Sequence, residues 1–275
     1  MEKSYSVFTK GLRIVDIHTH AFPDKIAEKA IQSLESMYTL KLLGDGTLKS
    51  LLRYMDDANV SISFLQMVAT KPEQVPSAND WLIQVKSQSK RFNGFGALHP
   101  NYPDYKKEIR KLADNDIHGI KFQTEFQFFY PDDESMFKIY REIGDNFFVM
   151  FHAGYEITSP TNPKASPERL ARLHDKFPKL KIIAAHFGGF LMQEDVDKYI
   201  IGTNIYIDTS LAFSHLSNDE IVRKINQHSH KRVFFGTDFP MKDPKIEIEN
   251  LLKLNLSDSV KRDILSNNVI REFRV

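Results

Sequence analysis

Residues 12–20 have the sequence LRIVDIHTH, and this stretch decides how the rest of the chain is interpreted. An apolar run that ends in Asp16-x-His18-x-His20 and is flanked by turn-forming residues is typical of a buried strand. Side chains two positions apart on a strand share a face, so Asp16, His18 and His20 are predicted to project together. Two neighbouring imidazoles can bind one metal ion, and Asp16 is expected to bind it too or to hold an imidazole. The alternative for an isolated His-x-His is a pair of structural histidines.

Composition narrows the class of protein. The chain has 275 residues, is 41% hydrophobic and 27% charged, and contains no cysteine, so any metal must be bound by His, Asp, Glu or a modified Lys. A net charge of +1 gives no indication of a nucleic-acid or membrane partner. The polar segment Met1–Lys10 is unlike a secretory signal, and no apolar run approaches the roughly 20 residues of a membrane span. A cytoplasmic protein is therefore expected.

Strand-like runs alternate with helical patterns along the whole chain. Short continuous apolar runs suit strands that are buried on both faces, as in a parallel sheet. Eight such units predict an α/β fold, a (β/α)8 TIM barrel that forms a single domain over residues 1–275. An open doubly wound sheet is the alternative, but no Gly-x-Gly-x-x-Gly follows the first strand. The predicted strands are residues 12–17, 60–68, 92–98, 117–122, 147–151, 180–185, 204–207 and 233–235.

Polar residues stand at or just after the ends of these predicted strands. In a barrel the carboxyl ends of all strands open on one face, where such enzymes carry their active sites. Scattered structural histidines have no reason to gather there, so the sequence predicts a functional site at that face. The residues in question are Asp16, His18, His20, His99, Lys121, His152, His186, Asp208 and Asp238.

Five motifs in this order resemble the amidohydrolase superfamily, in the amidohydrolase-related branch that includes aminocarboxymuconate-semialdehyde decarboxylase. The resemblance extends over about residues 12–270 and is specific for the branch, whereas it does not specify the substrate. The motifs are Asp16-x-His18-x-His20, Gly119-Ile120-Lys121-Phe122, His152-Ala153-Gly154, His186-Phe187-Gly188-Gly189 and Gly236-Thr237-Asp238-Phe239-Pro240.

The resemblance implies one divalent metal ion, with zinc expected and manganese as the other candidate. The implied metal ligands are His18, His20, His152 and Asp238. A metal can lower the pKa of a bound water to about 7, so that Asp238 accepts the proton of the attacking water. His186 would then be a second catalytic residue that shuttles protons.

The resemblance also bears on two further strand-end residues and on assembly. Lys121 is expected to meet a substrate carboxylate, rather than to be carboxylated and bridge two metal ions. Asp208 is expected to orient His186 or a substrate group, with a plain strand-end cap as the alternative. A homodimer is expected from the branch.

Aromatic residues suggest the kind of small molecule that binds. Phe126, in the aromatic segment 125–131, and Tyr155 are expected to line the site, or else to pack against neighbouring loops or a second subunit. The substrate would then be small and cyclic or aromatic, and a carboxylate on it would suit Lys121.

Three functions follow from this interpretation. The first is metal-dependent hydrolysis of a C–O or C–N bond in a lactone, ester or amide by a metal-activated water. The second is metal-dependent, non-oxidative decarboxylation of a small aromatic or unsaturated carboxylic acid. The third is a barrel that binds metal or ligand without catalysis. Some decarboxylases of the branch have Glu or Ala where this chain has Asp16 or His18, so the sequence favours hydrolysis.

Overall fold

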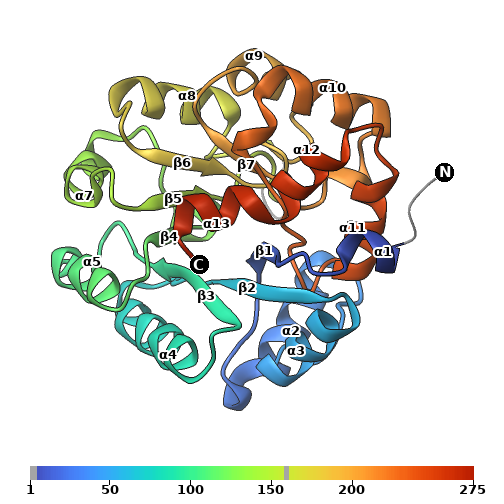
Figure 1. Ribbon diagram of the computed structural model, residues 1–275. Helices are drawn as coiled ribbons and strands as arrows, with labels where there is room; N and C mark the ends of the chain where they lie inside the picture. The colour runs from blue at the N-terminus through green and yellow to red at the C-terminus, as the bar shows by residue number, and fades with distance from the viewer. Residues whose placement is uncertain (1–4, 158–160) are drawn as a thin grey trace. The chain divides into compact units, whose positions relative to one another are not determined.

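The computed structural model describes residues 5–157 and 161–275, and within them eight strands form one sheet in the order β1 to β8. Helices alternate with the strands along the chain (Figure 1), as the predicted (β/α)8 barrel requires. The predicted fold class is confirmed, and the extent of the domain over residues 1–275 stays a prediction. The strands are β1 (Ile14–Thr19), β2 (Val60–Gln66), β3 (Phe92–Ala97), β4 (Gly119–Phe122), β5 (Phe148–Phe151), β6 (Lys181–Ala184), β7 (Tyr206–Asp208) and β8 (Val233–Phe234).

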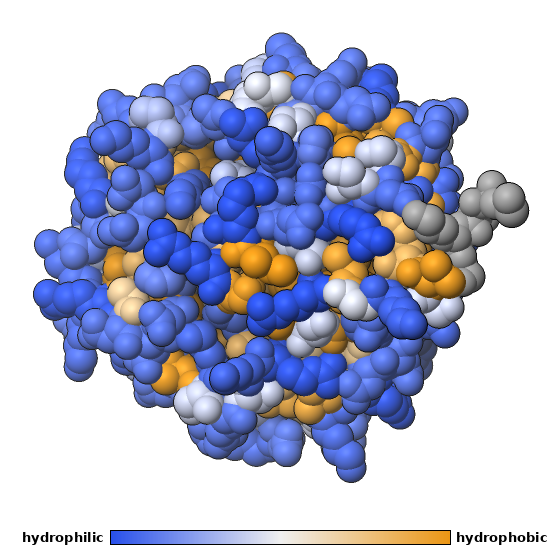
Figure 2. All heavy atoms as spheres, in the orientation of Figure 1, coloured by the Kyte–Doolittle hydropathy of each residue, from blue (hydrophilic) through white to orange (hydrophobic). Residues whose placement is uncertain are grey.

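The helices that separate these strands are mostly amphipathic, and on the face shown in Figure 2 hydrophobic side chains occur as small patches among hydrophilic ones. None of the helices in the described residues is long and apolar enough to cross a membrane. They are α1 (Tyr5–Thr9), α2 (Asp24–Tyr38), α3 (Leu48–Asp57), α4 (Val75–Gln88), α5 (Tyr105–Asp114), α6 (Thr124–Gln127), α7 (Phe137–Ile143), α8 (Pro167–Lys176), α9 (Gln193–Tyr199), α10 (Asn218–His228), α11 (Pro244–Lys253), α12 (Asp258–Arg262) and α13 (Asn268–Phe273).

The chain forms two compact units, one made of the residues up to Leu65 together with Thr209–Val275, and the other of Gln66–Asp208. In the first unit β1 pairs in parallel with β2. On its other side β1 is bonded to the segment that follows β8, because Ile17 N donates to Phe235 O at 2.9 Å and Asp238 N donates to His18 O at 2.8 Å. The first strand and the last are thus joined directly.

The second unit contains strands β3 to β7, which pair in parallel and in sequence order. Lys121 on β4 is in register with Ala97 on β3 and Met150 on β5. Met150 is in turn in register with Ile183 on β6. All four residues of β5 are buried, which explains the continuous apolar sequence of this strand.

Two segments differ from the predicted pattern. The aromatic segment 125–131, expected as a loop, begins inside the short helix α6. The C-terminal segment 257–271, whose sequence pattern predicts one helix, is divided into α12, a π-helical turn at Asp263–Asn267, and α13. Side chains there bond to strand backbone: Ser266 Oγ donates to Arg13 O at 2.7 Å and Asn268 Nδ2 donates to Val233 O at 2.8 Å. These tertiary contacts override the helical period that the sequence shows.

Asn79 fastens α4 to β3, and its removal tests this attachment. Its Nδ2 donates to Ala97 O at 3.0 Å and to Glu108 Oε2 at 2.8 Å, and its Oδ1 accepts from Ala97 N at 2.7 Å. All of these groups are buried, so Asn79→Ala should lower the free energy of unfolding by about 2–4 kcal/mol. Urea denaturation measures this loss. The control Asn115→Ala removes an exposed bond to Lys111 O and should cost under about 1 kcal/mol.

Glu247 on α11 predicts a dependence of stability on pH. Burial raises the pKa of its carboxyl from 4.5 to about 7, against the opposing effect of Lys242. The folded state therefore keeps a proton that the unfolded chain loses. As the pH rises from about 4.5 to about 7, the free energy of unfolding should fall by about 3 kcal/mol and then level off. Glu247→Gln should abolish this loss, whereas Glu249→Gln on the same helix should retain it; equal denaturation profiles for both variants would contradict the assignment.

Candidate metal centre

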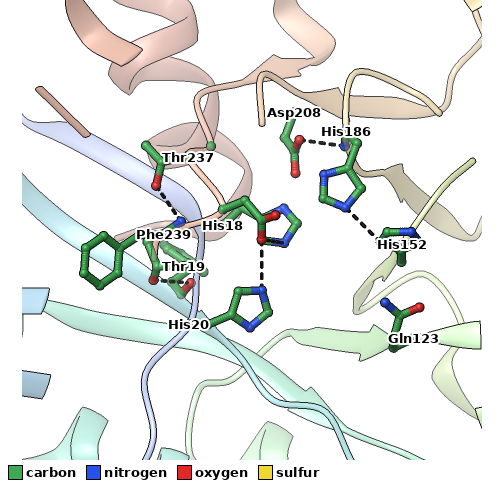
Figure 3. A network of polar contacts seen from close by, with 12 residues as sticks. His18, Thr19, His20, Gln123, His152, His186, Asp208, Thr237 and Phe239 are labelled. Carbon is green, nitrogen blue, oxygen red and sulfur yellow. Dashed lines mark hydrogen bonds and ion pairs between the residues drawn. The ribbon is translucent and has the colours of Figure 1, made fainter. Parts of the chain in front are cut away.

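The first cluster of polar residues, which we name the β1–β8 cluster, consists of Asp16, His18, His20, Thr237 and Asp238. His18 Nε2 lies 3.3 Å and His20 Nε2 3.1 Å from Asp238 Oδ1, the latter drawn as a dashed line in Figure 3. The three ligand atoms all lie within 4.8 Å of one another. In a tetrahedral zinc shell with bonds of about 2.0–2.2 Å, neighbouring ligand atoms are about 3.3–3.6 Å apart. The donor atoms and their spacing therefore fit a divalent metal ion.

The exposure of these groups also suits a binding site. The side chain of His18 is 1% exposed, whereas those of His20 and Asp238 are 24% and 12% exposed. The pair of imidazoles is thus anchored on one side in the protein interior and open on the other. An ion bound there would keep room for a further ligand, as in catalytic rather than structural zinc sites.

Asp16 has a different role from its neighbours, because it is not one of the three clustered ligand groups. Its Oδ2 accepts from Thr237 Oγ1 at 2.6 Å, and its Oδ1 accepts from Thr237 N and from His18 N, both at 3.1 Å. The side chain has no solvent exposure. Asp16 therefore links β1 to Thr237, the residue that precedes Asp238, and in this way helps to position the carboxylate of Asp238.

The second cluster, which we name the β5–β6 cluster, consists of Gln123, His152, Glu156, His186 and Asp208. His152 Nδ1 and His186 Nε2 lie 2.9 Å apart, as Figure 3 shows, and the two rings are 4.7 Å apart between centroids. His152 directly follows β5, and His186 lies two residues after the end of β6. Two ring nitrogens at this distance share one proton, or, when neither carries it, present two lone pairs that suit a cation.

The backbone at His186 is held in an unusual conformation. His186 and Phe187 have φ values of 58° and 56°, and Gly188 follows with 88°. Two successive non-glycine residues in the left-handed region are costly and persist only where the surroundings hold them. Asp208 contributes to this, because its Oδ1 accepts from His186 N and its main-chain oxygen accepts from Phe187 N, both at 3.0 Å. Asp208 thus bonds to the backbone of His186, and its role in orienting the ring or a substrate group stays a prediction.

Two residues of the β5–β6 cluster escaped the sequence analysis. Glu156 is only 2% exposed; its Oε2 lies 3.5 Å from His152 Nε2 and accepts from Gln123 Nε2 at 3.1 Å. Gln123 directly follows the predicted strand 117–122, but an amide side chain is neither titratable nor a usual metal ligand. Glu156 neither belongs to a motif nor follows a strand end. Its one available signal was an acidic residue four positions after a predicted histidine ligand.

The remaining predicted residues lie in the second unit. Lys121 is a buried residue of β4, 3% exposed. Phe126 in α6 and the side chain of Tyr155 are both half-buried. The carbonyl of Tyr155 lies 3.2 Å from His152 Nε2. His99 is a buried structural histidine, since its Nδ1 accepts from Asn101 N at 3.2 Å, and burial lowers its pKa.

The aromatic segment divides between packing and exposure. Phe129 is buried with its ring 5.4 Å from that of Phe122, and the guanidinium of Arg169 lies 4.0 Å above the ring of Tyr130. Phe128, by contrast, is 83% exposed. Packing against β4 and α8 therefore accounts for Phe129 and Tyr130, and the substrate role of Phe126 stays a prediction.

The structure thus brings His18, His20 and Asp238 together in one unit, and His152 with His186 in the other. The set of four ligands, His18, His20, His152 and Asp238, stays a prediction.

Replacing Asp16 tests its role as the support of Asp238. Asp16→Ala leaves the hydroxyl and amide of Thr237 and the amide of His18 without their buried acceptor. We expect the free energy of unfolding to fall by about 3–4 kcal/mol and metal affinity to fall with it. Asp24→Ala, which removes an exposed carboxylate on α2, is the control. Denaturation and metal titration check both, and a folded Asp16→Ala protein with unchanged stability would contradict this role.

Comparison with known proteins identifies the family of this chain. A family model described as amidohydrolase matches residues 15–275. No curated protein matches the sequence.

Several solved structures share the fold. The chain is similar to 2,6-dihydroxybenzoate decarboxylase from Rhizobium, with 16% identity, a TM-score of 0.74, and coverage of 96% of this chain and 99% of that chain. It is similar to 5-carboxyvanillate decarboxylase from Sphingomonas paucimobilis, with 16% identity, a TM-score of 0.70, and coverage of 96% and 99%. It is also similar to a dihydroxybenzoic acid decarboxylase from Polaromonas with bound manganese and the inhibitor 2-nitroresorcinol, with 16% identity, a TM-score of 0.69, and coverage of 95% and 96%. Because the family model covers nearly the whole chain, the chain belongs to the amidohydrolase superfamily.

Proposed function

We propose that this protein is a metal-dependent enzyme that decarboxylates a small aromatic or unsaturated carboxylic acid without oxidation. The observation that carries the metal dependence is the placement of His18 Nε2, His20 Nε2 and an Asp238 oxygen within 4.8 Å of one another. The type of reaction is supported by the similar solved structures, which are decarboxylases of aromatic acids. Hydrolysis, which the sequence favoured, becomes the second candidate.

We propose His18, His20, His152 and Asp238 as the ligands of one divalent ion. The argument comes from the fold: the carboxyl ends of barrel strands open on a common face, and these residues belong to or follow β1, β5 and β8. Nitrogen and carboxylate ligands suit zinc and manganese alike, and manganese gains support from the manganese-bound relative. Such an ion would supply a Lewis acid that polarises a substrate oxygen.

His186 is proposed to move the proton that the reaction needs. When a carboxylate leaves as CO2, the electron pair of the broken C–C bond remains on carbon, and that carbon must then take one proton. An imidazole can give and take a proton near neutral pH, and Asp208 holds the backbone that carries this ring, because its Oδ1 accepts from His186 N at 3.0 Å. Asp238 is the other proposed catalytic residue, because its carboxylate can hold a proton beside the imidazoles of His18 and His20.

Lys121 is proposed to bind an anionic group that the substrate keeps. The departing carboxylate loses its negative charge in the transition state, so an ammonium group on it would stabilise the bound acid more than the transition state. A retained phenolate or second carboxylate suits Lys121 better. Phe126, Tyr155 and Asp208 are the further proposed substrate contacts, consistent with a small cyclic or aromatic acid.

Hydrolysis of a lactone, ester or amide is the second candidate because the same groups can perform it. Asp238 would accept the proton of an attacking water, and His186 would pass a proton to the leaving group. The observation that favours it is the intact first-strand motif, because some decarboxylases of the branch have Glu or Ala where this chain has Asp16 or His18. The two reactions differ in their products, so one substrate panel separates them.

Metal content is the first test of the proposed function. The protein purified without chelator should contain about one manganese or zinc ion per chain by mass spectrometry. His18→Ala and Asp238→Ala should lose it, whereas His174→Ala, on α8, should retain it. A wild-type protein that takes up no manganese or zinc on titration would refute a metal-dependent function.

The substrate panel is the second arm of this test. Hydroxybenzoates and unsaturated acids should release CO2 in the presence of the metal-loaded enzyme, and His186→Ala should reduce kcat by about 10²–10⁴-fold while metal remains bound. Product formation only from lactones, esters or amides would establish hydrolysis instead.

A further inference from the structure

We propose that Glu156 is a positioning residue, itself held by Gln123, that fixes the ring of His152 so that its Nδ1 atom is the metal-binding nitrogen. This inference rests on the proposed function, because it takes His152 as a metal ligand. It assigns to Glu156 and Gln123 a role in the site that none of the sequence motifs includes.

The contacts of the His152 ring determine which nitrogen carries the proton. Its Nε2 faces two acceptors, the carbonyl oxygen of Tyr155 at 3.2 Å and Glu156 Oε2 at 3.5 Å. Neither acceptor can donate when Glu156 is ionised, so Nε2 must carry the hydrogen. In the neutral ring Nδ1 then holds a lone pair, and this atom points toward His186 Nε2 at 2.9 Å (Figure 3).

Glu156 is held in place by donors from two directions. Its Oε2 accepts from Gln123 Nε2 at 3.1 Å, and its Oε1 accepts from Ile157 N at 3.0 Å. A carboxylate that is 2% exposed requires such donors, since a buried charge without partners is strongly disfavoured. The amide of Gln123 cannot be reversed, because its oxygen would then face the carboxylate.

Gln123 connects this arrangement to the neighbouring strand. It follows the last residue of β4, two positions after Lys121, and the strand pairing places β4 beside β5. Its Oε1 is buried without a hydrogen-bond partner. The position of the side chain is therefore not explained by hydrogen bonds to its own amide oxygen, whereas its Nε2 bond to Glu156 does explain it. The position of a proposed ligand on β5 thereby depends on a side chain from β4.

A carboxylate beside Nε2 of His152 has a stronger effect on metal binding than the carbonyl of Tyr155. The carboxylate fixes the ring orientation and also increases the basicity of Nδ1 toward a metal ion. Loss of such a partner typically costs 10–100-fold in metal affinity. The Tyr155 carbonyl remains when Glu156 is removed, so binding should weaken rather than vanish.

The experiment compares Glu156→Ala and Glu156→Gln with the matched control Glu125→Gln in the full-length protein. Glu125 is also a buried carboxylate of the second unit, but it bonds to Lys164 N and not to a histidine. The Kd for Mn²⁺ should rise by about 10–100-fold in Glu156→Ala, by less in Glu156→Gln, which keeps a neutral acceptor, and by under about twofold in Glu125→Gln. The visible spectrum of the Co²⁺-loaded protein should change in the Glu156 variants only.

A second measurement needs no bound metal. In chelator-treated protein with ¹⁵N-labelled histidine, NMR should show His152 as the Nε2–H tautomer, with its signal identified by its loss in His152→Gln. Glu156→Ala should increase the population of the other tautomer. If Glu156→Ala does not fold, Glu156→Gln carries both measurements.

The outcomes separate this inference from the proposed function. An Nδ1–H tautomer in the wild type, or unchanged Mn²⁺ affinity and Co²⁺ spectrum in the folded Glu156 variants, would overturn the role of Glu156 and leave the metal centre standing. A wild-type protein that binds no ion would overturn the proposed function, and the role of Glu156 in metal binding with it.

Discussion

Asp16 has a carboxylate without solvent exposure, and hydrogen bonds to this carboxylate connect the first and last strands of the first unit. A buried charge needs hydrogen-bond donors, and here the amide and hydroxyl of Thr237 supply two of them. Since Thr237 directly precedes Asp238, the hydrogen bonds that stabilise the buried carboxylate of Asp16 also position the carboxylate of Asp238 beside His18 and His20. The junction of the first and last strands and the arrangement of the candidate ligands therefore have one physical cause.

Most of the fold could be predicted because strands buried on both faces have continuous apolar sequences. The run from Phe147 to Phe151 contains β5, and Val60 to Val68 contains β2, with boundaries within two residues. Prediction failed where contacts distant in sequence decide local structure. The turn at Asp263–Asn267 is π-helical in a segment whose side chains bond to Arg13 O and Val233 O, and no periodicity in residues 257–271 reveals those partners.

The candidate site was predictable to the extent that strand ends define it. His18, His20 and Asp238 do come together, and His152 does meet His186, because each stands on or just after a strand. Glu156 was missed because it acts through another residue, and such support has no fixed spacing in sequence. Gln123 directly follows β4, but an amide is neither a titratable group nor a usual metal ligand. The manner in which Asp208 acts was equally hidden, since a bond to the backbone of His186 leaves no trace in residue type.

The ligand set by itself does not choose between hydrolysis and decarboxylation, because both reactions use a polarised substrate oxygen and a mobile proton. They differ in the atom that takes the proton: a heteroatom leaving group in one case, a substrate carbon in the other. If His186 delivers that proton, as we propose, the choice depends on the position of its ring, which follows two left-handed residues held by Asp208. In the proposed reaction the backbone just after β6 therefore matters together with the residues proposed to bind the metal.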